Sequence, residues 1–264
     1  MDWLHPLSGF LVGMLVGVTG VGGGALMAPI LILILGVSPV TAVGTDLWFA
    51  AITKMVGGAI HHSLGQPDWQ VVKRLALGSI PASIVTSLAL GQVNVAPFLQ
   101  GIIIEAIGVL LLATALANLF WARVQHRVQH FALSFDPDVA ARNRQRQQWL
   151  TVLAGAVLGI LVTLTSVGAG ALGAAMLIAL YPLRMTAKRL VGTDIVHAVP
   201  LTVVAGFGYL WLGKVDFPLL GSLLVGSIPG IVIGSLIATR LSGDYLRPLL
   251  AIVLGVTGIK MLFS

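Results

Sequence analysis

Five ionisable side chains lie within or at the start of long apolar segments of this sequence: Asp46, Lys54, Glu105, Asp194 and His197. A charged group in such a segment is costly, and it usually faces a polar cavity or a partner. Lys54 is a candidate countercharge for an anion, and the alternative is a structural ion pair with Glu105. The other four are candidates for binding a coupling cation, H⁺ or Na⁺. His197 has a second interpretation as a hydrogen-bonded interior histidine.

Two glycine-rich stretches interrupt apolar runs and indicate a second kind of site. Residues 17–25 lie within the run 7–35, and residues 164–171 lie within the run 149–180. Each glycine weakens a helix by about 1 kcal/mol relative to alanine and allows a backbone or a ligand to approach closely. A helix that resumes after such a break presents free N–H groups and a positive dipole end, which suit an anion.

The candidate substrate contacts lie in these two stretches and in the segments that follow them: Thr19, Gly20, Gly22, Gly23, Gly24, Thr45, Trp48, Lys54, Thr165, Ser166, Gly168, Gly170 and Thr193. Hydroxyl and amide groups donate hydrogen bonds to an anion without the desolvation cost of a buried cation. The competing interpretation of the glycines is helix packing, because small residues let membrane helices touch. Thr45 and Thr193, with the aspartates that follow them, have a competing role as helix caps.

The composition decides the class of protein. Of the 264 residues, 57% are hydrophobic and only 9% are charged, and the mean hydropathy is +1.00. A soluble domain carries about 25% charged residues. Apolar stretches of the ~20 residues needed to cross a bilayer recur along the chain. The sequence therefore predicts an all-α polytopic membrane protein, and no cleaved signal peptide is expected.

Net charge and cysteine content narrow the chemistry. The formal charge is +6 and the pI is near 10.2. Membrane proteins keep an excess of Lys and Arg on cytoplasmic loops, so we expect no nucleic-acid binding. The sequence has no cysteine, which excludes disulfides, thiolate metal sites and a cysteine nucleophile. We expect no metal site and no cofactor.

The sequence contains an internal duplication. Residues 43–46 (Val-Gly-Thr-Asp) recur at 191–194, a shift of 194 − 46 = 148, and Asp68 returns as Asp216 with the same shift. The glycine-rich stretches match at 168 − 22 = 146. We therefore predict three parts: a first transmembrane repeat over 1–122, a basic linker over 123–148 and a second transmembrane repeat over 149–264.

Each repeat is predicted to hold one glycine-broken segment followed by three spans: 42–64, 71–90 and 98–121, then 190–212, 218–238 and 247–263. A broken segment either crosses once, which makes the repeats parallel, or dips to the midplane and returns, which makes them inverted. Length favours a hairpin, because the twelve residues 7–18 form about 18 Å of helix, enough for half of a ~30 Å core.

The distribution of Lys and Arg favours the same topology. The inverted arrangement places twelve of them on the linker side and only Lys214 and Lys260 opposite, against nine and five for the parallel arrangement. Cytoplasmic loops carry the excess of basic residues. We therefore expect two inverted-topology repeats, each a re-entrant helical hairpin followed by three transmembrane helices, with the linker in the cytoplasm.

The glycine loop 20–24, Pro29 in the arm after it and the segment 38–45, with their second-half counterparts, resemble the TauE/SafE sulfite exporter family. The resemblance covers nearly the whole chain. It implies a permease of the bacterial inner membrane for small sulfur-containing anions such as sulfite, sulfoacetate or related organosulfonates. The chain departs from the family pattern at Asp46 and Asp194, where a small polar residue is expected, and at Ala175, which stands opposite Pro29. These departures leave room for an unusual substrate or coupling ion.

Transport is the leading functional hypothesis, with alternating access around a midplane site between the hairpin tips. The expected partners are the small anion, the bilayer and H⁺ or Na⁺. An intramembrane enzyme would need a nucleophile with a base, or clusters of carboxylates and histidines, deep in the spans. The remaining alternative is a transporter or channel for another small carboxylate or inorganic anion.

Overall fold

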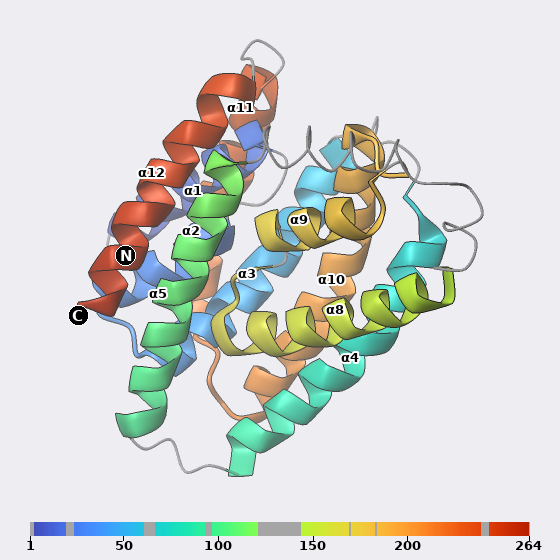
Figure 1. Cartoon of the computed structure of the whole chain (residues 1–264). Coiled ribbons are helices and arrows are strands. Elements are labelled where there is room, and N and C mark those ends of the chain that lie inside the picture. The colour runs from blue at the N-terminus through green and yellow to red at the C-terminus, as the bar shows by residue number, and fades with distance from the viewer. Residues whose placement is uncertain are drawn as a thin grey trace.

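The computed structural model describes residues 3–19, 24–60, 67–92, 97–120, 144–168, 170–182, 184–238 and 243–263. This part of the chain is all-helical (Figure 1). Its ten helices are α1 (Leu4–Thr19), α2 (Gly24–Leu33), α3 (Pro39–Ile60), α4 (Trp69–Gln92), α5 (Pro97–Leu119), α8 (Arg144–Thr165), α9 (Ala171–Leu180), α10 (Ala187–Trp211), α11 (Phe217–Ala238) and α12 (Gly243–Leu262).

Several helices match the dimensions of a bilayer. Five are long and apolar enough to cross it: α4, α5, α8, α10 and α11. The 22-residue α3 contains Asp46 and Lys54. Exposed tryptophans lie at the ends of helices, as at Trp69, Trp149 and Trp211, where interfacial anchors are expected. The chain is therefore a multi-pass membrane protein.

The two glycine-broken segments form helix pairs with unequal arms. The second arms begin at Gly24 and Ala171, as predicted, and both are ten residues long. The first arms are longer than predicted: α1 has 16 residues, about 24 Å, and α8 has 22, about 33 Å. Helix α8 is thus longer than its part of the predicted apolar run, because it begins before that run, at Arg144, and it packs against α4 from Leu75 to Ser83.

Glycines bring α1 and α11 into backbone contact. A Cβ added at Gly9 would lie 2.0 Å from the carbonyl oxygen of Leu223, and one added at Gly17 would lie 2.3 Å from that of Ile231. No side chain fits at these points, which is the small-residue packing typical of membrane helices. Because both residue numbers increase together, α1 runs parallel to α11.

A similar contact joins α8 to α4, and it fixes a second parallel pair. Gly155 faces the Leu75 carbonyl and Gly159 faces the Ser79 carbonyl, with added Cβ atoms at 2.2 and 2.3 Å. The central helices α3 and α10 are antiparallel instead, since Gly44 near the start of α3 faces Tyr209 near the end of α10, whereas Lys54 further along α3 lies beside Asp194 near the start of α10.

Helices α3 and α10 lie between the α5–α12 pair and the α4–α8 pair (Figure 1). The main cluster of buried apolar side chains draws on every described helix except α9. A smaller cluster joins α4 and α9 to the start of α10. The polar side chains described next are therefore enclosed by apolar packing from both halves of the sequence.

Candidate functional site

Lys54 on α3 and Asp194 on α10 form an ion pair inside the bundle. Lys54 Nζ lies 3.6 Å from Asp194 Oδ2, and the two side chains are only 8% and 5% exposed. The antiparallel packing of the two helices brings the later turns of α3 against the first turns of α10. The alternative pairing of Lys54 with Glu105 was wrong, because Glu105 is exposed on the outer surface of α5.

Polar groups from two further helices surround this pair. His197, one turn after Asp194, is buried, and its Nε2 lies 2.9 Å from Ser79 Oγ on α4. The interpretation of His197 as a hydrogen-bonded interior histidine is thus confirmed. Asp194 Oδ1 lies 3.1 Å from the position of a Cβ at Gly173, so a glycine allows α9 to approach the carboxylate.

Asp46 is fully buried in α3 in a different environment. Its Oδ2 accepts a hydrogen bond of 3.2 Å from the Ala28 amide of α2. The Ser166 hydroxyl, from the loop between α8 and α9, lies beside the carboxyl group. Asp46 Oδ1 and Ser166 Oγ are both buried, and neither makes a hydrogen bond of good geometry within the described residues. No described basic side chain pairs with Asp46.

The loop between α8 and α9 holds Ser166 in an unusual conformation. Ser166 has φ 58°, in the left-handed region that disfavours a residue with a Cβ, and Gly168 has φ 113°. The Thr165 hydroxyl donates to the Leu161 carbonyl at 2.6 Å and accepts from the Val167 amide at 3.1 Å. The Thr165 hydroxyl therefore stabilises the loop itself, whereas the Ser166 hydroxyl lies beside the Asp46 carboxyl group.

Gly170 begins the second arm of this hairpin. It is the N-cap of α9, and no side chain caps the helix in the part of the chain that the structure describes. The amides of Gly173 and Ala174 donate to the carbonyls of Gly168 and Gly170. The amides at the very start of α9 come before these hydrogen bonds in the sequence. They lie next to the loop that carries Ser166.

Thr45 and Thr193 connect the two halves at equivalent places. Thr193 Oγ1 accepts a 3.0 Å hydrogen bond from the Asp68 amide, and Thr45 Oγ1 accepts one of 3.0 Å from the Asp216 amide. Each contact ties the start of one helix after a hairpin, α10 or α3, to the start of a long helix of the other half, α4 or α11. The interpretation of these threonines as caps of their own helices is wrong, because α3 begins at Pro39 and α10 at Ala187, six residues before each of them. They accept a hydrogen bond from the residue just before a helix of the other half instead.

Sequence reasoning found Asp68 and Asp216 as repeated residues but missed their role. The Asp68 carboxylate accepts a 3.4 Å hydrogen bond from the Val71 amide, and the Asp216 carboxylate accepts one of 2.9 Å from the Leu219 amide. Both aspartates are therefore N-terminal caps, of α4 and of α11. An aspartate directly before an apolar span, recurring at the same shift, was the signal that could have identified them.

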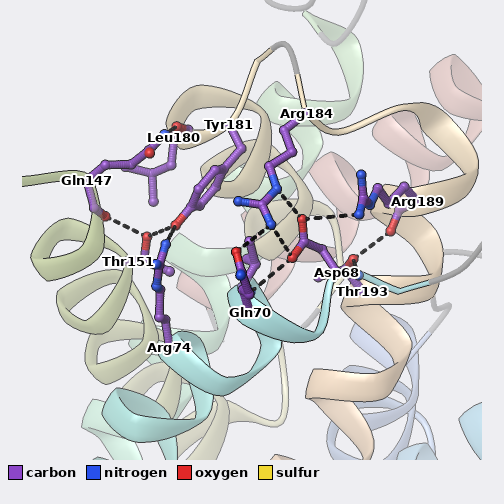
Figure 2. Close-up of polar contacts among 11 residues, drawn as sticks. Asp68, Gln70, Arg74, Gln147, Thr151, Leu180, Tyr181, Arg184, Arg189 and Thr193 are labelled. Carbon is purple, nitrogen blue, oxygen red and sulfur yellow. Dashed lines mark hydrogen bonds and ion pairs between the residues drawn. The ribbon is translucent and has the colours of Figure 1, made fainter. Parts of the chain in front are cut away.

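Among the described residues, arginines contact Asp68 but not Asp216 (Figure 2). Arg184 Nη2 donates to Asp68 Oδ1 at 2.9 Å, and Arg184 Nε lies 2.5 Å from Oδ2. Arg189 Nη2 lies 3.7 Å from Oδ2, and Gln70 Oε1 accepts a further bond from Arg184 at 2.8 Å. We call these four residues the Asp68 cluster. It fastens the α9–α10 connection to the start of α4.

A neighbouring network closes the α8–α9 hairpin at the same end of the molecule (Figure 2). Thr151 Oγ1 and the Tyr181 hydroxyl are 2.7 Å apart, and Arg74 Nη1 donates to the Tyr181 hydroxyl at 3.3 Å. Gln147 donates to the Leu180 carbonyl. The end of α9 therefore returns to the first turns of α8.

Of the remaining predicted substrate contacts, Trp48 and Gly24 lie in described helices and the others lie partly or wholly outside the described part of the chain. Trp48 Nε1 donates to the Gly206 carbonyl at 3.1 Å, and its ring packs edge-on against Phe207, so the side chain is anchored to α10. Gly24 is the first residue of α2. The Thr19 side chain and residues Gly20, Gly22 and Gly23 lie outside the described part. Within that part there is no group of three His, Cys, Asp or Glu side chains placed to hold a metal ion.

Comparison with known proteins gives a consistent result. The chain is 39% identical over 260 residues to "Probable membrane transporter protein YjnA" of Bacillus subtilis, covering 97% of this chain and 98% of that protein. It is 27% identical over 270 residues to "Probable membrane transporter protein MJ0441" of Methanocaldococcus jannaschii, covering 96% and 92%. No solved structure matches at a significant level. The profile of the family described as "Sulfite exporter TauE/SafE" matches residues 6–261, so the chain belongs to the TauE/SafE family of membrane transporters, which are not enzymes.

Proposed function

We propose that the chain is a permease for small sulfur-containing anions such as sulfite, sulfoacetate or related organosulfonates. The observation that carries the proposal is the buried ion pair of Lys54 and Asp194, held at the contact of α3 and α10 beside Gly173 of α9. Ionisable groups buried in membrane spans mark substrate pathways, and the ammonium group of such a pair can exchange its contact with the carboxylate for one with an anion. The uncapped start of α9 adds N–H donors suited to oxyanions.

We also propose that the two halves, 1–122 and 149–264, are inverted repeats. Helix α1 runs parallel to α11, whose start is tied to the start of α3 through Asp216 and Thr45. The α1–α2 hairpin therefore begins and ends at one face of the bundle. In the second half, α8 runs parallel to α4, whose start is tied to the start of α10 through Asp68 and Thr193. The α8–α9 hairpin therefore begins and ends at the face where α10 starts. Because α3 and α10 are antiparallel, these faces are opposite.

Transport then proceeds by alternating access, with one repeat rocking against the other around the site between the hairpin tips. The face with Arg74, Arg184 and Arg189 is the cytoplasmic one, since basic residues collect there. The linker 123–148 lies on the same side, and the membrane is the bacterial inner membrane. The Asp68 cluster is a contact that must open when the site faces the cytoplasm.

The structure supports some of the predicted substrate contacts more than others. Lys54, Ser166 and Gly170 are the members that lie at the buried polar groups or at the uncapped helix start. Thr45, Thr165 and Thr193 have hydroxyls already engaged in tertiary or loop contacts. For the Thr19 side chain and for residues 20–23 the role stays a prediction from sequence.

The substrate is tested by ligand-induced stabilisation of the purified protein. A ligand that binds only the folded state at a hundred times its Kd raises the stability by about 2.7 kcal/mol. We expect sulfite, sulfoacetate or taurine to raise the unfolding temperature more than sulfate or thiol-carboxylates do. Counterflow of the best ligand in proteoliposomes then distinguishes a carrier from a channel. Stabilisation by carboxylates alone, or flux without counterflow, would favour the alternatives.

A further inference from the structure

Two aspartates in equivalent sequence positions have different electrostatic partners. Asp46 and Asp194 are related by the 148-residue shift, and both are buried in the helix that follows a hairpin. Asp194 is neutralised by the Lys54 ammonium group at 3.6 Å. Asp46 has the Ala28 amide on Oδ2 and no basic partner among the described residues, and its Oδ1 is left without a hydrogen bond. One site thus contains a tethered cation, and the other lacks one.

Few charged groups lie on the described helices that pack against α3 around Asp46. Of the helices packed against α3, both α2 and α11 have no charged residue, and α8 has them only in its first turn. Helix α10 carries Lys188 and Arg189 in its first turn and Asp194 and His197 further along. Its Tyr209 lies against Gly44 of α3, and the Tyr209 hydroxyl donates to the Thr163 carbonyl. Helix α3 itself contributes Lys54. On α1 the only titratable group is His5 near its start, and on α5 it is the exposed Glu105. An unpaired buried carboxylate costs several kcal/mol and repels an approaching anion.

The two side-chain oxygens without hydrogen-bond partners at Asp46 indicate which cation neutralises this carboxylate. Sodium needs several oxygen ligands, whereas Asp46 Oδ1 and Ser166 Oγ are the only side-chain oxygens of the described residues left without partners here. A single proton satisfies both: protonated Asp46 donates its O–H to Ser166 Oγ, while the Ala28 amide still donates to Oδ2. Because Ser166 Oγ accepts that bond, the Ser166 hydroxyl keeps its own hydrogen to donate to an anion.

We infer that Asp46 is the proton-binding residue of this transporter and that Ser166 communicates its protonation to the substrate. The inference rests on the proposed function and names the coupling ion of the same site. The proton comes from bulk water and adds to the carboxylate, so the site gains one positive charge as the anion enters. Asp194 does not take part in this exchange, because Lys54 already neutralises it.

The proton site is tested without any substrate by infrared difference spectra of the purified protein on acidification. Wild type is expected to give a band of a protonated buried carboxyl group, and Asp46→Asn is expected to lose it. The matched variant is Asp194→Asn combined with Lys54→Met, which leaves no unpaired charge and should keep the band. Loss of the band in that double variant but not in Asp46→Asn would overturn the inference. So would suppression of the band by Na⁺ at constant ionic strength.

The coupling is tested in proteoliposomes with labelled sulfoacetate, whose sulfonate group stays ionised. We expect an imposed pH gradient to drive accumulation in wild type and not in Asp46→Asn or Ser166→Ala. Counterflow in wild type without gradient-driven accumulation would overturn the inference and leave the proposed function standing. The absence of counterflow and of ligand-induced stabilisation for every sulfur anion would instead count against the proposed function, while the infrared result still judges the proton site.

Discussion

Asp68 and Arg184 form a two-point contact in which the guanidinium Nη2 donates to Oδ1 at 2.9 Å and Nε lies 2.5 Å from Oδ2. The contact joins the start of α4 to the connection between α9 and α10. At the equivalent position Asp216 also caps a helix and also bonds to a threonine, but no basic side chain in the described ranges pairs with it. The two ends of the bundle are therefore fastened differently, and the difference can be measured.

The first prediction compares Asp68→Asn with Asp216→Asn. Asparagine keeps the capping oxygen, so both variants retain the helix caps, and only Asp68→Asn loses an arginine clamp. Arg184 and Arg189 are 38% and 42% exposed, so the loss is moderate, about 1–3 kcal/mol. We expect a clearly lower unfolding temperature for Asp68→Asn and little change for Asp216→Asn.

The same pair of variants tests the opening of the cytoplasmic face. The chain has no cysteine, so Ser166→Cys introduces a unique thiol at a hairpin tip. In the Asp68→Asn background this thiol should react faster with a membrane-impermeant reagent added from the linker side. Equal reaction rates in the Asp68→Asn and Asp216→Asn backgrounds would show that the Asp68 cluster does not hold that face closed.

The second prediction concerns the buried pair of Lys54 and Asp194. Removing one partner leaves an uncompensated charge, so Lys54→Met alone should cost about 3–5 kcal/mol of stability. The double variant with Asp194→Asn should recover most of that stability, since no charge is left buried. Counterflow should be lost in both. A double variant that transports at the wild-type rate would show that the ammonium group has no role in binding the anion.

The third prediction tests the glycine contact between α1 and α11. A Cβ at Gly226 would lie 1.8 Å from the Pro6 carbonyl oxygen, and backbone on both sides cannot yield. Gly226→Ala should therefore destabilise the protein by about 1–3 kcal/mol. Gly221, on the same helix, has nothing within 4 Å of an added Cβ, so Gly221→Ala should be neutral or stabilising by up to about 1 kcal/mol. Thermal unfolding of the two variants in one detergent makes the comparison.

The fourth prediction separates the backbone of Ser166 from its hydroxyl group. Glycine relieves the cost of φ 58°, which is about 1–2 kcal/mol for a residue with a Cβ, whereas alanine retains it. Ser166→Gly should therefore unfold at a higher temperature than Ser166→Ala. Both lose the hydroxyl, so both should lose proton-driven accumulation of sulfoacetate. If only one variant lost it, loop conformation and not the hydroxyl group would be responsible.

Much of the helical organisation was predictable because it depends on local chemistry. Glycine density located the breaks, and both second arms begin where the apolar pattern resumes, at Gly24 and Ala171. The predicted spans overlap the long helices α3, α4, α5, α10, α11 and α12. The length of α8 was underestimated because its polar first turn extends the helix beyond the apolar run at Trp149. Helix propensity does not end at the membrane boundary.

The partners of the charged residues could not be predicted in the same way. Lys54 meets Asp194, which is 140 residues away (194 − 54 = 140), and Asp68 meets Arg184 across the same bundle. Such contacts depend on the rotation of each helix about its axis and on its depth relative to a neighbour. The rotation and the depth are both fixed where a glycine packs against a backbone carbonyl of the neighbouring helix. The sequence shows the glycine but not which carbonyl it contacts.

By itself, the sequence determined the class of protein, most of its helices and the family, because apolar length, glycine density and motifs such as the recurring Val-Gly-Thr-Asp can be recognised within single segments. Only the tertiary structure decided that Asp194 has a cation, that Asp46 has none among the described residues, and that arginines bind Asp68 at one end of the bundle. Two repeated residues can have different chemistry because their neighbours are not repeated. Asp194 has Lys54 beside it, and the residue 148 positions after Lys54 is Thr202, which carries no charge (54 + 148 = 202). Comparing the two halves of the sequence does not reveal which residues are in contact in the fold.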